Sequence, residues 1–528
     1  MEYNESDKNK TLKSRYDSCE VLRSNYLNRA YDASELTIPF LLPRNEKNNQ
    51  DFYTPWQSVG ARGVNNLASK LLLTLFPPNQ PFFKLEIDDF TLQDLTQSKE
   101  MRGTVEDGLG SVERAIMSSF ETTATRVPYF EALLHLIVTG NVLTYEDPSG
   151  KTKIYTLDQY VIKRDKVGHL VECIVKESVS PKVLDKEFLK LLKSDEQNNP
   201  DKYDNDIDIF TCVKLEDGGT YYHVYQETEG KKVPKSEGKY PIDKCPWRAL
   251  RLHRIANEDY GRGLCEQYIG DLRALENLSR AMVEGSVASS KVLFLVRPNG
   301  STKEKTLAKA PNGQIVSGDV NDVGVLQLQK FNDFRTVREM IVTITERLES
   351  AFLLNSSVQR QAERVTAEEI RFMARELEAS LGGIFSVLSQ EMQLPLVNYR
   401  MAWLAKQGKL PELPKGVVNP IIITGFDALG RGHDVEKLRM FMQDLSAIGP
   451  EQILTYLNPI EFIKRIGTGH GIDTSGLVKS QEQVQQEQQQ QQQMMAQQQM
   501  LDKLGPNIVN QGGQLIKEGV KQNAESPN

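Results

Sequence analysis

Cysteine is scarce in this chain, and the few cysteines present form neither a ligand set nor a disulfide framework. Cys19, Cys173, Cys212, Cys245 and Cys265 are scattered, odd in number, and include no CxxC pair. Structural zinc sites use closely spaced cysteine pairs, and disulfide-rich domains use a dense, even set. The sequence therefore predicts reduced thiols and no structural zinc site.

Long apolar runs are missing as well. No stretch of about 18 apolar residues occurs, so we expect no membrane-spanning helix. The first ten residues, MEYNESDKNK, are polar and acidic, whereas a signal peptide has basic residues followed by an apolar segment. We expect neither a signal peptide nor a membrane among the partners.

The chain also lacks an excess of positive charge. Its 64 Lys and Arg residues are outnumbered by 71 Asp and Glu residues, which gives a net charge of -7. This balance argues against a tight, sequence-independent DNA binder, because neutralising phosphates requires clustered cations. It is compatible with a protein through which DNA only passes, since an acidic wall repels phosphate.

The sequence motifs of common enzymes are absent. Residues 313–318 have the glycine spacing of a Walker A loop, but Asp319 and Val320 stand where Lys and Ser or Thr are required. Gly261 and Gly263 lack the third glycine of a dinucleotide fingerprint, and neither HExxH nor GxSxG occurs. We therefore predict no enzyme activity, no catalytic residue and no cofactor.

The six histidines do not indicate a metal site, because no two of them are four residues apart. His135 lies in an apolar helical segment and is interpreted as a core residue with satisfied hydrogen bonds. His433 beside Asp434 has the order of a base and its orienting acid, but the Val-Glu-Lys that follows favours a helix N-terminus. The many carboxylates are interpreted as a solvated surface, and we predict no metal site.

With 528 residues, the chain is long enough for two to four domains or one large discontinuous domain. Apolar residues recur at helical spacing in its first part, and Pro77-Pro78 ends the second helical segment. The predicted helices cover residues 15–33, 56–76, 105–123 and 129–139.

Between residues 142 and 250 the pattern changes to β-branched and aromatic residues that partly alternate with polar ones. Turn signals such as Asp217-Gly218-Gly219 separate these stretches, which is typical of antiparallel strands. We predict strands at residues 153–157, 160–163, 170–175, 207–213 and 220–226, and an exposed loop at 194–206.

Two long helices then flank a small insert. Helical spacing covers residues 263–290 and 333–354, and short strands and turns are predicted between them. Each helix would span roughly 30–40 Å at 1.5 Å per residue, which suits an elongated subunit better than a compact catalytic domain. A capping box at Thr366 to Glu369 starts another long helix, predicted to run to about residue 393 until Pro395 interrupts it.

The last part of the chain is predicted to be helical, with glycine-rich joints. Gln fills thirteen of the twenty positions 481–500. Gln and Met are good helix formers, but such a tract is also typical of disordered segments. We favour a helix to about residue 500, with a frayed tail after it.

Twelve short segments are similar to the head-to-tail connectors, or portal proteins, of T7-like podoviruses. They occur in the family order and span about residues 15–480. They are YTPWQ (53–57), VGARG (59–63), NNLASKL (65–71), GNVL (140–143), YGR (260–262), YIGDLR (268–273), LNS (354–356), VQR (358–360), ERVTAEEIR (363–371), QE (390–391), QLPLV (393–397) and GIDTSG (471–476). The Gln-rich tract is not part of this resemblance.

The resemblance implies an α+β fold that is mostly α, namely the phage portal fold. Its parts fall on residues 1–262 as an N-terminal wing with helices and an antiparallel β region, and on 263–290 and 331–354 as two stem helices. Residues 291–330 would be the clip, 355–365 the tunnel loop and 366–425 the long wing helix. Residues 426–480 would form the crown, 481–505 a Gln-rich barrel helix and 506–528 a flexible tail.

The resemblance also implies the function. Such a subunit forms a homo-dodecameric ring at a unique capsid vertex, nucleates procapsid assembly, and passes double-stranded DNA during packaging and ejection. The implied partners are DNA, bound weakly and without sequence preference, the major capsid protein, the terminase large subunit, a tail adaptor or gatekeeper protein, and internal core or scaffolding proteins. The implied locations are the virion and, during assembly, the host cytoplasm.

Three groups of site residues follow from this resemblance. In the tunnel loop, Gln359, Arg360, Gln361 and Arg364 would face DNA, because guanidinium groups suit phosphate contact; Arg364 could instead pair with Glu368 or Glu369. In the clip, Lys303, Lys305 and Lys309 would meet terminase, tail proteins or DNA, or simply form a solvated face. Stem packing would use Leu272, Leu275, Ile341, Ile344, Leu348 and Phe352, either between subunits or within one.

Other side chains have roles that the sequence leaves open. Six stem charges could form ion pairs between subunits, although exposed pairs stabilise by only ~0–1 kcal/mol each: Asp271, Arg273, Glu276, Arg335, Arg338 and Glu346. Trp56, Arg62 and Asn66 are notable only through the family resemblance and are interpreted as packing and helix-capping residues. Two other classes of function remain as alternatives, a different virion assembly protein and an enzyme acting on packaged DNA.

Overall fold

The structure is a computed structural model in which two compact units are distinguished, Met1–Leu429 and Gly430–Asn528. It describes residues 10–44, 53–78, 81–86, 99–183, 206–216, 218–290, 293–326, 331–354, 367–410, 421–424, 431–446 and 459–469, and scattered positions between 477 and 495.

The four helices predicted in the first part of the chain are confirmed, with slightly different ends. They are α1 (Leu12–Glu35), α2 (Val59–Leu75), α4 (Lys99–Thr122) and α5 (Arg126–Thr139). The side chain of Thr11 caps α1 by accepting a hydrogen bond from the Ser14 amide, as is usual for a threonine at this position. Gly140 ends α5 with a left-handed φ of 78°, a conformation that glycine adopts without strain.

The predicted antiparallel β region is also confirmed. A three-stranded sheet has the order β10 (Trp247–Arg251), β2 (Asn141–Glu146), β3 (Thr152–Tyr155). A six-stranded sheet has the order β4 (Tyr160–Arg164), β5 (Leu170–Val179), β6 (Ile207–Leu215), β7 (Tyr221–Thr228), β8 (Lys231–Lys232), with β9 (Gly238–Pro241) also paired to β7. Short 3-10 turns lie at Pro181–Val183 and Ile242–Lys244.

The six-stranded sheet is covered on both faces because its strands alternate. Cys173 and Val175 of β5 face a core that contains Trp247, and the intervening Ile174 faces the other side. There it packs with Leu12 and Tyr16 of α1. The period of two along the strands thus places α1 against the sheet.

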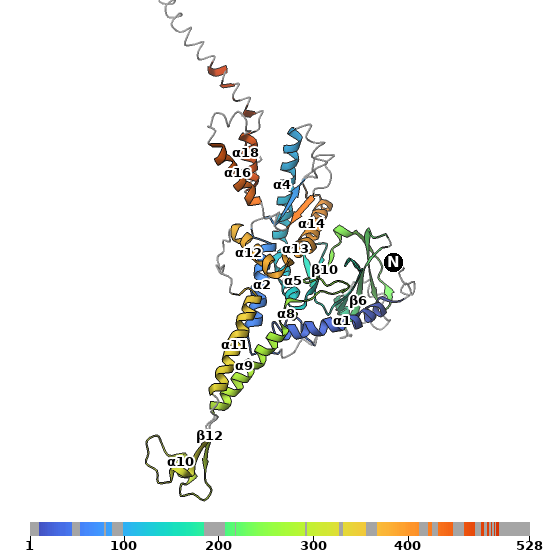
Figure 1. Ribbon diagram of the computed structural model, residues 1–528. Coiled ribbons are helices and arrows are strands. Elements are labelled where there is room, and N and C mark those ends of the chain that lie inside the picture. Colours follow the sequence, from blue (N-terminus) through green and yellow to red (C-terminus); the bar gives the residue numbers. More distant parts are fainter. Residues whose placement is uncertain are drawn as a thin grey trace, which may run out of the picture. The chain divides into compact units, whose positions relative to one another are not determined.

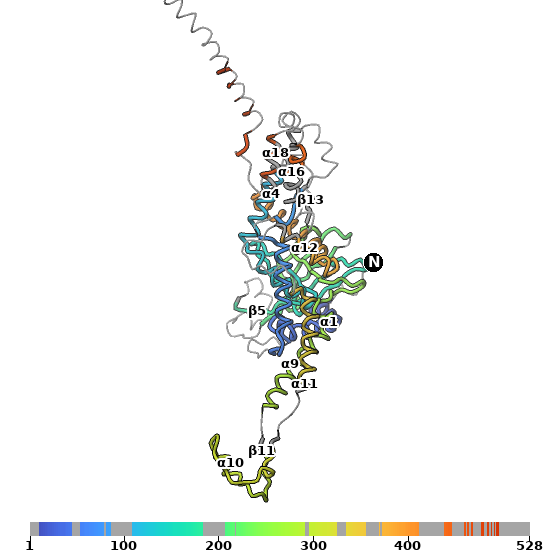
Figure 2. The backbone as a smooth tube through the Cα atoms, turned by 60° about the vertical axis from the view of Figure 1, so that its left-hand side comes forward, coloured from blue at the N-terminus to red at the C-terminus, as the bar shows by residue number. Residues whose placement is uncertain are grey.

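The helix–insert–helix arrangement is confirmed. After the short α8 (Leu264–Gln267), α9 (Ile269–Ser290) and α11 (Phe331–Ala351) lie side by side, as both views show (Figures 1 and 2). Between them in the chain come β11 (Leu293–Val296), α10 (Glu304–Lys309), a 3-10 turn at Val320–Asp322 and β12 (Val323–Leu326). The strands β11 and β12 pair antiparallel.

The prediction of one helix from residue 366 to 393, interrupted at Pro395, is wrong. The helix α12 (Ala367–Leu381) ends where Gly382 and Gly383 both take positive φ, 61° and 89°. The chain then continues through α13 (Ile384–Leu388), a π-helical turn (Ser389–Gln393) and α14 (Leu394–Lys406). Pro395 stands in the first turn of α14, where its missing N–H is not needed.

The largest apolar core joins these helices. It contains buried side chains of α2, α4, α5, α8, α9, α11, α12, α13 and α14. The strands β1 (Phe83–Glu86) and β13 (Ile421–Thr424) pair antiparallel, and the buried carboxylate of Glu113 on α4 accepts a hydrogen bond from the Leu85 amide at 2.6 Å. This core therefore ties the segment after residue 366 to the first helices of the chain.

In the second unit, α16 (Arg431–Ser446) and α18 (Pro459–Gly469) are described. The helix α16 contains His433 and Asp434 in its first turn, which confirms the helix N-terminus interpreted from the sequence. Most of the predicted Gln-rich helix lies outside the described residues, but the positions described between 483 and 495 are helical.

Candidate functional site

The C-terminal end of α11 is held by side chains of α2. Leu353 has a left-handed φ of 54°, which costs energy for a residue other than glycine. The Nδ2 of Asn66 donates to the carbonyls of Phe352 and Leu353 at 3.2 and 3.1 Å, and the Nζ of Lys70 donates to Leu353 O at 2.8 Å. The point where the chain leaves α11 is therefore set by α2.

Close packing supports this hold. A Cβ built on Gly63 of α2 would lie 2.6 Å from Cγ of Phe352, so only glycine allows α2 to approach α11 this closely. Phe352 is fully buried. Burial also lowers the pKa of Lys70, whose ammonium group lies at this junction.

Trp56, Arg62 and Asn66, interpreted from the sequence as packing or capping residues, make different contacts. Asn66 is a capping residue, as predicted, although it caps another helix rather than its own. Trp56 donates its backbone N–H to both carboxylate oxygens of Glu276, while its side chain is 45% exposed. Arg62 is exposed, with Nη2 3.9 Å from Oε1 of Glu349. Trp56 and Asn66 thus attach α2 and the segment before it to both long helices.

The predicted DNA-facing residues lie outside the described residues. The structure describes the chain up to Leu354 and again from Ala367. The gap contains Gln359, Arg360, Gln361 and Arg364. They remain a prediction. What the structure does describe is the segment's origin on α11 and its return into α12.

The three predicted clip lysines are exposed around α10. Lys303 precedes the helix, Lys305 lies in it and Lys309 ends it. None of the three forms an ion pair among the described residues. Nearby, the carboxylate of Asp322 accepts hydrogen bonds from the Thr302 amide and the Ser301 hydroxyl, and these bonds lower its pKa. They connect the turn after β11 to the turn before β12.

The predicted stem-packing residues are buried within the single chain. Leu272 and Leu275 of α9, Ile344 and Leu348 of α11, and Phe352 directly after α11 are at most 5% exposed. Ile341 is partly buried against the same core. The structure thus describes them in the intrasubunit role that the sequence left open, and contact with a second chain remains a prediction.

The six stem charges have different surroundings. Asp271 pairs with Arg347 at 3.1 Å, Arg273 binds Asp32, and Arg335 lies 3.6 Å from Glu339. The buried Glu276 accepts hydrogen bonds from Tyr53 and from the backbone of Trp56. Within the described part of the chain, Arg338 and Glu346 have no ion-pair partner.

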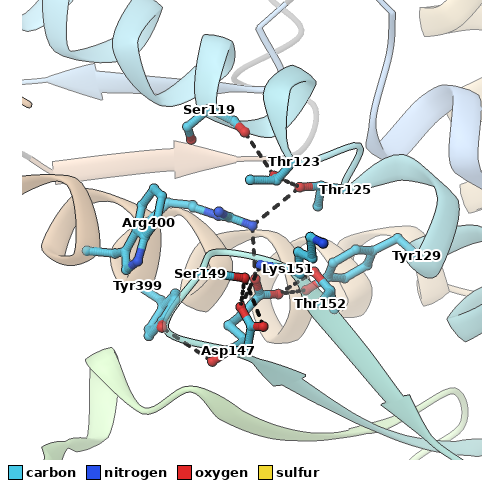
Figure 3. A network of polar contacts seen from close by, with 12 residues as sticks. Ser119, Thr123, Thr125, Tyr129, Asp147, Ser149, Lys151, Thr152, Tyr399 and Arg400 are labelled. Carbon is cyan, nitrogen blue, oxygen red and sulfur yellow. Dashed lines mark hydrogen bonds and ion pairs between the residues drawn. The ribbon is translucent and has the colours of Figure 1, made fainter. Parts of the chain in front are cut away.

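A buried polar network that the sequence patterns did not predict joins α14 to the three-stranded sheet (Figure 3). Glu146 at the end of β2 receives Nη2 of Arg248 at 2.8 Å and Nη2 of Arg400 at 3.0 Å. The hydroxyls of Tyr129 and Thr152 donate to the same carboxylate at 3.3 and 2.9 Å. Burial raises the pKa of Tyr129 to about 12, so its hydroxyl stays protonated as a donor.

One signal for this network was present in the sequence. Arg400 stands four residues after Leu396 and four before Leu404, where helical spacing predicts an apolar side chain. A charge at such a position requires a buried partner. Its identity, Glu146, could not be read from the spacing.

His135, which the sequence analysis weighed as a possible ligand, lies in the core. His135 is 1% exposed in the core, and burial lowers its pKa to about 4. Its core position is confirmed, but its Nδ1 has no hydrogen-bond partner among the described residues, so the predicted satisfaction is wrong for that atom. No group of His, Cys, Asp and Glu in the described ranges could hold a metal ion. No helix in the described part of the chain is long and apolar enough for a membrane span.

Comparison with known proteins points to one family. The model of the bacteriophage head to tail connecting protein family matches residues 9–478. The portal protein of Escherichia phage T7 is 42% identical over 479 residues, which are 90% of this chain and 89% of that protein. The portal protein of Enterobacteria phage T3 is 41% identical over 478 residues, covering 90% and 89%. That of Enterobacteria phage SP6 is 30% identical over 427 residues, covering 80% and 81%.

Proposed function

The chain belongs to the bacteriophage head-to-tail connecting protein family, and on this premise we propose that twelve copies form a closed ring through which double-stranded DNA passes. Members of this family are structural connectors of the head–tail junction, so this chain is a portal protein of the T7-like kind and not an enzyme. The subunit number, the DNA path and the individual partners are the proposal.

The proposed ring is supported by the exposed apolar side chains of α9 and α11. Of the 22 residues of α9, only Leu272, Leu275 and Glu276 are buried. Val283 and Val287 of α9 are 46% and 57% exposed, and Met340 and Val342 of α11 are 50% and 48% exposed. Apolar side chains on both helices would be covered if neighbouring copies packed beside this pair.

The parts of the subunit receive proposed roles on this basis. The two helices would be the stem, residues 291–330 the clip outside the capsid, and residues 355–365 the tunnel loop. Gln359, Arg360, Gln361 and Arg364 would line the channel. The clip lysines Lys303, Lys305 and Lys309, all exposed, would meet the terminase large subunit and later a tail adaptor.

The remaining parts of the subunit would face the capsid and its interior. Residues 1–262 and 366–425 would form the wing facing the major capsid protein, and residues 426–505 the crown and barrel facing internal core or scaffolding proteins. During assembly in the host cytoplasm, the ring would nucleate the procapsid. In the finished virion it would stay at one vertex.

Mass and symmetry test this proposal directly. Twelve chains of 59.7 kDa give about 716 kDa. Native mass spectrometry with electron-microscopy class averages should show a hollow ring near this mass, with a channel about as wide as duplex DNA. A compact monomer or dimer at every protein and salt concentration would contradict it and favour another assembly protein.

A further inference from the structure

The outward faces of α9 and α11 each carry one row of charged side chains. The row on α9 contains Arg273, Arg280 and Glu284, and the row on α11 contains Arg335, Glu339 and Glu346. All six residues are exposed. Residues four and seven apart lie on one side of a helix, so each row is a stripe along its helix. On α9 the buried Glu276, which accepts hydrogen bonds from Tyr53 and the Trp56 backbone, lies between Arg273 and Arg280.

The two stripes point away from each other. The side chains buried between the helices and the core are Leu272 and Leu275 on α9, and Ile344 and Leu348 on α11. At about 100° per residue, the stripe of α11 lies on the opposite side of that helix from Ile344 and Leu348. On α9 the stripe lies roughly 140° around the helix from Asp271 and Gly285, which contact α11. Within one chain the two stripes therefore cannot pair.

The stripes nevertheless match level by level along the helix axes. The helices are antiparallel, with Gly285 of α9 packed against Phe334 of α11, and Asp271 paired with Arg347 fourteen residues earlier on α9. Counting from Gly285 and Phe334 in opposite directions places Glu284 level with Arg335, Arg280 with Glu339, and Arg273 with Glu346. Each level thus carries opposite charges on the two outward faces.

Four of the six charges pair within their own helix. Arg280 pairs with Glu284 at 2.9 Å and Arg335 with Glu339 at 3.6 Å, each one helical turn apart, and all four side chains are more than half exposed. Arg273 binds Asp32 of α1, and Glu346 has no ion-pair partner among the described residues. Such exposed charges stay available to a second chain.

We propose that α9 of one subunit packs beside α11 of the next copy at the same height, with the two charged stripes facing each other. Arg273, Arg280 and Glu284 then meet Glu346, Glu339 and Arg335 of the neighbouring copy. This inference rests on the proposed ring. In the proposed arrangement the two helices run along the ring axis. Rotation about that axis keeps equivalent residues at one height, so the level match within the chain becomes a match between neighbours.

The order of the charges also selects this height. A shift by one helical turn in one direction would bring Arg280 beside Arg335, and in the other direction Glu284 beside Glu339. Like charges facing each other at an interface are unfavourable. The unshifted arrangement is therefore favoured over its nearest alternatives, because it pairs Arg280 with Glu339 and Glu284 with Arg335.

Two charge-swapped chains test the proposal without removing any helical ion pair. In the first, R335E/E339R reverses the stripe of α11, and in the second, R280E/E284R reverses that of α9. Each swap retains its own pair one turn apart, so helix stability is preserved. The full-length chains are expressed separately, and ring formation is measured by native mass spectrometry and mass photometry across protein and salt concentrations.

Each swapped chain alone should form rings poorly at low salt, about tenfold more weakly per interface, because two attractive pairs become repulsive. An equal mixture of the two should recover rings with alternating subunits, because every interface is then complementary. The chain carrying all four substitutions should form rings by itself. High salt should reduce all these differences.

The outcomes separate this inference from the proposed ring. If the unaltered chain forms no ring, the proposed function fails first. If unaltered and swapped chains all form rings equally well at low salt, the ring stands and the stripe pairing is overturned. If swapped chains fail alone and their mixture also fails, while circular dichroism shows them folded, the pairing of these two faces is likewise overturned.

Discussion

Arg400 of α14 and Glu146 of β2 are 254 positions apart in the sequence and form a fully buried ion pair, with Nη2 3.0 Å from Oε2. Arg248 approaches the other carboxylate oxygen at 2.8 Å. One carboxylate thus holds two guanidinium groups that come from different elements. The pair fixes the segment after residue 366 to the sheet formed before it.

Replacing this carboxylate should destabilise the protein strongly. In the Glu146→Gln variant both arginines lose their charged partner in the core, which costs about 3–5 kcal/mol when a buried pair is broken on one side. Urea unfolding followed by circular dichroism measures the loss. Lys239→Met, which breaks the exposed pair with Glu216, should change stability by less than about 1 kcal/mol. Equal effects of the two substitutions would contradict the role given to Glu146.

Two glycine substitutions should have opposite effects. Gly63→Ala places a Cβ 2.6 Å from Phe352 and should destabilise by about 1–3 kcal/mol through overpacking. Gly270→Ala, where nothing lies within 4 Å of the added Cβ, should be neutral or stabilise by up to about 1 kcal/mol. Thermal and urea unfolding of both variants checks this. A Gly63→Ala protein as stable as the unaltered chain would show that α2 can move away from α11.

Replacing Asn66 should lower the stability of the protein, whereas replacing the adjacent Asn65 should not. Asn66→Ala leaves the carbonyls of Phe352 and Leu353 without this donor and should cost about 1–3 kcal/mol. Hydrogen exchange at the amide of Leu354, which donates to Glu349 O at 2.8 Å, should become faster. In the matched control Asn65→Ala, an exposed side chain that binds Ala61 O of its own helix is removed, and stability should change by less than about 0.5 kcal/mol. Unchanged exchange in Asn66→Ala would refute the capping role.

His135 should make the protein less stable in mild acid. Burial lowers its pKa from 6.5 to about 4, so below pH 6.5 the unfolded chain binds a proton that the folded chain does not. Stability is therefore fully present above pH 6.5 and is lost as pH falls toward 4, by roughly 2 kcal/mol at pH 5. Because carboxylates also titrate, the quantity to measure is the difference between the unaltered chain and His135→Leu at pH 8 and pH 5. If both proteins lose the same stability, His135 does not titrate as stated.

The arginines of residues 355–365 should affect DNA passage rather than assembly. R360Q/R364Q removes two guanidinium groups that we propose to contact phosphate, so in phage assembly the yield of filled heads should fall several-fold while ring mass stays unchanged. The control K151Q/K166Q removes the same charge from exposed lysines elsewhere and should leave the yield unchanged. An equal loss in both would point to net charge, and no loss in either would remove these arginines from the channel wall.

Local patterns were sufficient for much of this architecture. The helical period of Ile341, Ile344, Leu348 and Phe352 predicted α11, and alternation predicted the strands from β4 to β7. Their bounds shifted by only a few residues, because these patterns record which side of each element is buried. The family segments placed the same elements in order. The absence of motifs for phosphate, metal and nucleophile chemistry was visible without any structure.

Sequence patterns alone therefore specify the helices and strands, their order and the family of this chain. Tertiary structure decided which distant groups meet, namely Glu146 with Arg400 and Asn66 with the end of α11. It also decided which charges of α9 and α11 lie at the same level. It also decided that α12 ends at Gly382 and Gly383 instead of at Pro395. The two differ because they act over different distances along the chain. Periodicity and propensity act within a few turns of chain, whereas the partner of a buried charge or a helix end depends on how whole elements pack.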